Sequence, residues 1–133
     1  MKNETKLGIG LLLLRVFAGL RIIYGVIDNV ISSEKMKEFE GFLTQFNFPF
    51  PNISAIVSVY VQLICGILIG YQTKWASSLL VINFLVAIFM VHLPANDTIE
   101  ATTPAVALLV ISLSLIFTGS GKFSIDNFKK TKA

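Results

Sequence analysis

The stretch "LLLLRVFAGLRIIYG", residues 11–25, is apolar enough to cross a lipid bilayer, yet it contains two arginines, Arg15 and Arg21. It belongs to a chain of 133 residues, of which 54% are hydrophobic and only 14% are charged. A soluble domain of this size could not bury so much apolar surface, because small domains have a high ratio of surface to volume. The composition therefore predicts a membrane protein.

Four segments approach the roughly 20 apolar residues that a helix needs to span the hydrocarbon core. They are residues 7–27, 53–71, 75–93 and 99–118. The fourth segment spans the core only if Glu100 lies in its first turn, whereas a start at Thr103 would make it short. We expect an all-α fold, an integral membrane four-helix bundle that forms a single domain over residues 1–133.

Lysine residues predict which way the segments cross, because short cytoplasmic loops are enriched in lysine and arginine. Seven lysines lie before residue 7, at Lys74 or after residue 118. The loops on the other side, residues 28–52 and 94–98, contain only Lys35 and Lys37. Both termini are therefore predicted to be cytoplasmic.

The stretch "EKMKEFEGFLTQF", residues 34–46, follows the first segment and alternates apolar and charged residues at roughly helical intervals. Its apolar positions include Phe39, Phe42 and Phe46. We expect an amphipathic helix at the membrane interface between the first and second crossings. Pro49 and Pro51 then prevent the helix from continuing.

Polar side chains inside the predicted crossings need a partner or a route to water, because a charge at bilayer depth costs at least about 2.5 kcal/mol. Arg15 lies eight residues after Leu7, about 12 Å into the membrane. Arg21 lies closer to the outer boundary. Because both interrupt the apolar run, we do not expect the first segment to be a cleaved signal peptide. We expect an outer-facing ligand-binding pocket formed by Arg15, Arg21, Tyr24, Gln62, His92 and Glu100.

These residues also have a purely structural interpretation. Both arginines could lock helix packing, His92 could be an interfacial residue, and Gln62 and Asn83 could join helices by hydrogen bonds. Asn83 is deep enough to contact Arg15. One histidine and the single cysteine, Cys65, predict no metal site, and the scattered cations predict no nucleic-acid partner.

Four stretches resemble the DoxX family of small bacterial membrane proteins. They are "LLRVFAGLRIIYG" (13–25), "VQLICGILIGYQTK" (61–74), "VAIFMVH" (86–92) and "TGSGKFSID" (118–126), the last being the most specific. The resemblance implies four helices with both termini cytoplasmic, in the cell inner membrane, and a redox role near quinone. Arg15, His92 and Glu100 are the polar residues that match the family pattern.

The chain departs from that pattern at several polar positions. It has Tyr24 where the family commonly has histidine, Asn29 where it has lysine and Gln62 where many members have glutamate. Cys65 and Gly66 replace a glycine pair. These departures weaken the transfer of any proton or quinone chemistry from the family to this chain.

Two hypotheses follow for the function. The first is a membrane subunit linked to quinone-dependent redox chemistry, with no built-in cofactor, which holds a quinone in the outer-facing pocket. The second is a non-catalytic assembly or interaction subunit, in which Phe39, Phe42 and Phe46 dock a protein partner. Both hypotheses include a protein partner or a homo-oligomer. A transporter is disfavoured, because four short helices offer little room unless the protein dimerises.

Overall fold

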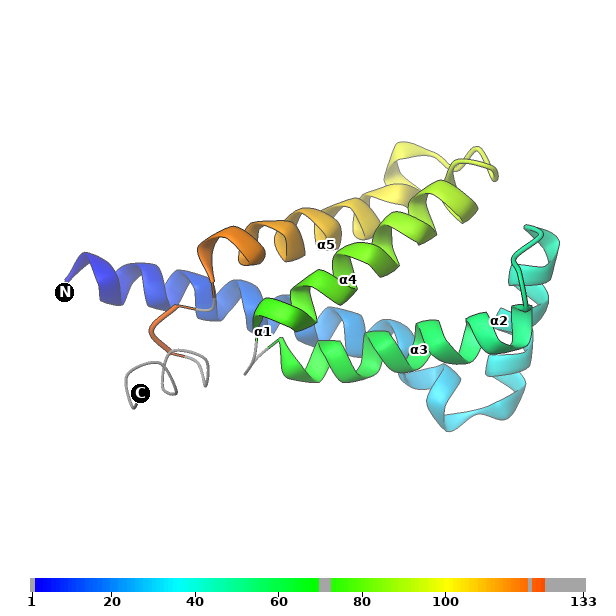
Figure 1. Cartoon of the computed structure of the whole chain (residues 1–133), viewed down its shortest axis with the longest axis horizontal. Coiled ribbons are helices and arrows are strands. Elements are labelled where there is room, and N and C mark those ends of the chain that lie inside the picture. The colour runs from blue at the N-terminus through cyan, green and yellow to red at the C-terminus, as the bar shows by residue number, and fades with distance from the viewer. Residues whose placement is uncertain (1, 70–72, 120, 124–133) are drawn as a thin grey trace.

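The computed structural model describes residues 2–69, 73–119 and 121–123, and the described segments are helices joined by short turns (Figure 1). The helices are α1 (Asn3–Ile31), α2 (Ser33–Gln45), α3 (Pro51–Leu68), α4 (Thr73–Ala87), a short π-helix η1 (Ile88–His92) and α5 (Ile99–Thr118). Residues 70–71 of the second predicted crossing and residues 120 and 124–126 of the carboxy-terminal motif lie outside the described residues.

Within the part of the chain that the structure describes, four stretches of helix are long and apolar enough to cross a membrane, as the sequence predicts. They are Asn3–Ile31, Pro51–Leu68, Lys74–His92 and Ile99–Thr118. The last begins at Ile99 rather than at Thr103, because Thr98 caps it by accepting a 3.1 Å hydrogen bond from the Ala101 N–H. Glu100 thus lies in the first turn.

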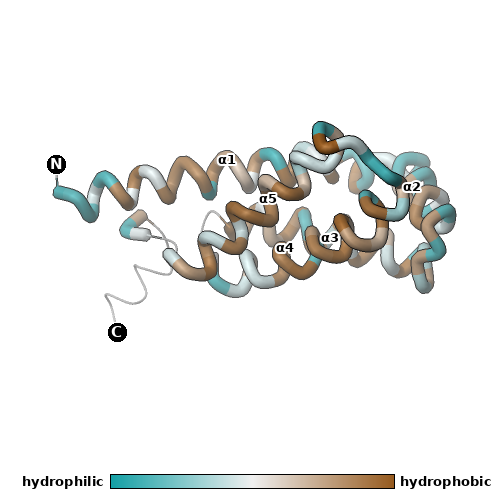
Figure 2. Tube along the Cα trace, turned by 90° about the horizontal axis from the view of Figure 1, so that it is seen from above, coloured by the Kyte–Doolittle hydropathy of each residue, from teal (hydrophilic) through white to brown (hydrophobic). Residues whose placement is uncertain are grey.

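Large apolar side chains are exposed along all four of these helices, including Phe17, Ile53, Phe89 and Phe117. In Figure 2 the middle of the molecule is hydrophobic, whereas hydrophilic residues gather around α2 and near the start of α1. Water would oppose so much exposed apolar surface, but lipid is a suitable solvent for it. The fold is therefore that of a multi-pass membrane protein.

The helices diverge toward the end of the molecule at which α2 lies, which we call the α2 end. In Figure 1, α4 and α5 run side by side and separate from α1 and α3 as they approach this end. Extensive contacts join α4 to α5 and α1 to α3, whereas contacts between α1 and α5 are few. The structure is thus two helix pairs that meet at the opposite end, which we call the closed end.

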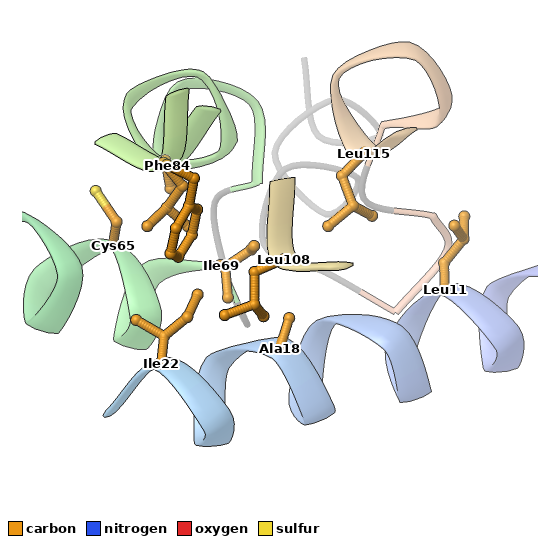
Figure 3. Close-up of a cluster of buried hydrophobic side chains, with 10 residues drawn as sticks. Leu11, Ala18, Ile22, Cys65, Ile69, Phe84, Leu108 and Leu115 are labelled. Atoms are coloured by element: carbon orange, nitrogen blue, oxygen red, sulfur yellow. The ribbon is translucent and has the colours of Figure 1, made fainter. Parts of the chain in front are cut away.

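Small residues allow the helices to meet at the closed end. A Cβ atom on Gly19 of α1 would lie 2.6 Å from the Gly66 carbonyl oxygen of α3, so the two backbones touch there. Ala18 and Ala76 are fully buried in the same cluster as Ile69 and Leu80. Figure 3 shows side chains of α1, α3, α4 and α5 pointing toward one another in this cluster. Close backbone approach of this kind is the main source of helix association in lipid.

Helix α2 lies across the other end of the two pairs. Ser32 caps it, accepting a 3.3 Å hydrogen bond from the Lys35 N–H. Leu43 of α2 is buried with Ala55 of α3 and Val91 of η1, and Met36, Phe39, Phe46 and Phe48 pack around them. A helix is thus present at Ser33–Gln45, close to the predicted residues 34–46. That it is an amphipathic helix at a membrane interface stays a prediction.

The contact between Gly19 and Gly66 predicts different effects for two glycine substitutions in α1. Gly19→Ala would force α1 away from α3, and overpacking of this kind costs about 1–3 kcal/mol. Gly10→Ala is the matched control, because a Cβ atom on Gly10 meets nothing within 4 Å. We expect thermal unfolding in detergent to show a lower midpoint for Gly19→Ala only. Equal midpoints for the two variants would contradict this packing.

Candidate functional site

A cavity of about 630 Å³ lies between the two helix pairs toward the α2 end. Its walls are mostly apolar and come from α1, α2, α3, α4, η1 and α5. Among the apolar lining residues are Phe42 of α2, Phe84 of α4 and Leu108 of α5. Its volume falls within the range of about 300–1,000 Å³ that is usual for small-molecule sites, which are also mainly apolar.

A row of three hydrogen-bonded side chains crosses one wall of this cavity. The Gln62 amide donates a 3.2 Å hydrogen bond to the Ser58 hydroxyl, which in turn donates a 3.2 Å bond to the Asn83 side-chain oxygen. We call these residues the amide row. Gln62 and Ser58 lie one turn apart on α3, and Asn83 faces them from α4. All three line the cavity and are partly buried, so the row gives an apolar cavity one polar wall.

His92 and Asp97 form a second polar group at the α2 end of the cavity. His92 Nδ1 lies 2.8 Å from Asp97 Oδ2, and both residues line the cavity. His92 ends η1, in which the chain is wound one residue wider than an α-helix and the Leu93 N–H bonds to the Ile88 carbonyl at 2.9 Å. Such π-helical turns are frequent at functional sites. The contact between His92 and Asp97 joins the end of η1 to the turn before α5.

Arg21 lies at the edge of the cavity on α1. Its side chain is exposed and lies along the helix toward Gly25, one turn further on. A Cβ atom on Gly25 would lie 3.1 Å from Arg21 Nη1. Both residues line the cavity. Gly25 thus leaves room for the guanidinium group to lie along α1 beside the cavity.

Arg15 lies elsewhere, because six residues separate it from Arg21 and this rotates it by about 240° around α1. Its side chain is fully buried, and Nη2 donates a hydrogen bond to the Phe123 carbonyl oxygen. Residues 121–123 pack against α1 there: a Cβ atom on Gly121 would lie 2.9 Å from Leu11. Arg15 therefore fastens the chain that follows α5 onto α1.

The structure brings together three of the six residues expected to share a pocket. Arg21, Gln62 and His92 line the cavity, whereas Arg15, Tyr24 and Glu100 do not. Tyr24 points away from the helices with 77% of its surface exposed, and Glu100 is exposed beside the cavity-lining Ala101. Helix rotation explains both cases, since neighbouring residues on a helix point about 100° apart.

Sequence reasoning missed Ser58 and Asp97 as members of the site, and it left Asn83 without an assigned partner. The structure pairs Asn83 with Ser58 instead of Arg15. One signal for Ser58 is present in the sequence: Ser54, Ser58 and Gln62 recur every four residues and so form a polar stripe on one face of α3. The sequence carries no comparable signal for Asp97, because the conformation of the turn between η1 and α5 decides that this residue meets His92.

Two phenylalanines of α2 and the one that follows it lie near the cavity, and Phe42 keeps 40% of its surface exposed. Phe39 and Phe42 line the cavity, and Phe46 packs beside Leu43 and contacts Phe42 edge to face, with ring centroids 5.0 Å apart. These are the three residues that the assembly hypothesis uses to dock a partner. The docking of a partner through these residues stays a prediction.

The family model described as DoxX matches residues 10–93 of the chain. This range includes the amide row and ends one residue after His92. No curated protein and no solved structure matches the chain.

The positions of the two arginines predict opposite effects on stability. Arg15→Gln removes a charge-assisted hydrogen bond between α1 and residues 121–123, which is worth about 1.5–3 kcal/mol. Arg21→Gln, the matched control, changes an exposed side chain and should alter the free energy of unfolding by less than about 0.5 kcal/mol. Unfolding in mixed micelles with increasing SDS measures both values. A larger loss for Arg21→Gln than for Arg15→Gln would contradict the assignment.

Proposed function

The chain belongs to the DoxX family, and from that premise we propose that it holds a quinone in the cavity between its two helix pairs. The observation that carries the proposal is an apolar cavity with one polar wall. A quinone has an apolar tail, a flat ring and two carbonyl oxygens that accept hydrogen bonds. The cavity offers complementary groups for each of these parts.

The walls suit the ring and the tail. Phe39, Phe42 and Phe84 supply aromatic surface within the cavity, and aromatic rings pack favourably against other flat rings. Val57 and Ile82 line the cavity and are also more than half exposed. The cavity therefore communicates with the lipid around the helices, which is the phase in which a quinone dissolves.

The polar groups suit the head group. The amide row can donate a hydrogen bond to one carbonyl oxygen of the quinone. Arg21, at the edge of the cavity, has a guanidinium group that only donates hydrogen bonds. The pair of His92 and Asp97 is the best placed of these groups to exchange a proton between the cavity and water.

A bound quinone would supply the capacity to accept electrons and protons, and the residues of this chain would hold and orient it. A protein partner would supply the electron-carrying centre. The proposal includes the cell inner membrane as the location, with both termini cytoplasmic, because the lysine distribution favours that orientation.

Blocking the cavity tests the proposal. Ala101 of α5 lines the cavity and is exposed, so Ala101→Trp should place an indole ring at its edge without disturbing buried packing. Ala107→Trp is the matched control, because Ala107 is also exposed on α5 but does not line the cavity. We expect native mass spectrometry with added decylubiquinone to detect at least tenfold less bound quinone for Ala101→Trp than for Ala107→Trp. Equal binding by the two variants would place the quinone outside the cavity.

A further inference from the structure

The amide row consists entirely of groups that both donate and accept hydrogen bonds. Gln62 and Asn83 each carry an NH₂ donor and an oxygen acceptor, and the Ser58 hydroxyl does both. In one direction of the row, Gln62 donates to Ser58 and Ser58 donates to Asn83, which leaves the Asn83 NH₂ group and the Gln62 oxygen for a ligand. Rotation of the hydroxyl and both amides reverses the row. The Asn83 oxygen and the Gln62 NH₂ group then face the ligand.

We propose that this reversible row lets the cavity bind the oxidised and the reduced form of its ligand with similar affinity. The oxidised head group, a quinone, has oxygens that only accept hydrogen bonds, whereas the reduced quinol has hydroxyls that donate them. A lysine or arginine in the place of the row would favour the quinone, and a carboxylate would favour the quinol. Side-chain amides joined through a hydroxyl favour neither.

The surroundings of the row support this role. Its members are partly buried, whereas Arg21 is exposed at the edge of the cavity and His92 is engaged with Asp97. Ser54, one turn before Ser58 on the same face of α3, donates its hydroxyl to the Pro49 carbonyl at 2.6 Å. Among the polar groups that line the cavity, the row is the one built from neutral side chains on two different helices. It can therefore reverse without moving a net charge through lipid.

This inference rests on the proposed function, and the test separates the two. Binding of decylubiquinone and of decylubiquinol is measured on the wild-type protein in nanodiscs, the latter under anaerobic conditions. We expect dissociation constants within about threefold of each other. A preference of more than tenfold for one form would overturn the reversible row and leave the proposed function standing. Binding of neither form would overturn both.

Gln62→Glu tests the row directly. An ionised carboxylate only accepts, so it fixes Ser58 as its donor, fixes Asn83 as the donor to Ser58, and leaves the Asn83 oxygen facing the ligand. We expect the ratio of quinone to quinol affinity to fall at least tenfold. Gln45→Glu makes the same chemical change at an exposed position of α2 that does not line the cavity, and it should leave the ratio unchanged. An unchanged ratio in Gln62→Glu would overturn the inference.

Ser58→Ala provides a second test that introduces no charge into the membrane. It uncouples the two amides without fixing the direction of either. We expect both forms to bind about threefold to tenfold more weakly, with their ratio unchanged. A loss confined to one form would overturn the inference, because it would mean that the row has a fixed direction.

Discussion

The contact between the backbones of α1 and α3 at Gly19 and Gly66 is the constraint on which the rest of the structure depends. In lipid there is no hydrophobic effect to drive helices together, so association depends on close packing of small residues and on interhelical hydrogen bonds. Several small residues of this chain are buried at the closed end, where Ala18, Cys65 and Ala76 are almost fully buried. Because the helices are joined there, they can separate at the α2 end and leave a cavity between them.

The two arginines of α1 show how one helix serves both ends. A charge inside a membrane is tolerated where it finds a partner or reaches a polar surface. Arg15 satisfies this requirement by binding the Phe123 carbonyl, which also fixes the chain after α5 against the closed end. Arg21, exposed and about 240° around the helix, satisfies it at the edge of the cavity. The two arginines therefore lie in similar stretches of sequence but differ in role: Arg15 holds the chain after α5, and Arg21 lies beside the cavity.

The sequence predicted the positions of the helices along the chain well, but predicted less well which side chains meet in space. The four crossings follow from hydropathy, which is a local property, and the helix over residues 34–46 follows from its periodicity. The cavity depends on the rotation of each helix about its own axis. A change of one residue, about 100°, decides that Ala101 lines the cavity and Glu100 does not. Nothing local to Arg15 indicates that residues 121–123 fold back to meet it, since the two positions are 108 residues apart.

The central claim is that the cavity, rather than the outer surface of the helices, is where a quinone binds. The most direct measurement is photo-crosslinking with a quinone that carries a photoreactive group on its ring, with the adducts mapped by peptide mass spectrometry. The account predicts adducts on cavity-lining residues such as Val57, Val61 and Leu79. Adducts restricted to the lipid-facing surface of α1, at Leu13 and Phe17, would contradict it.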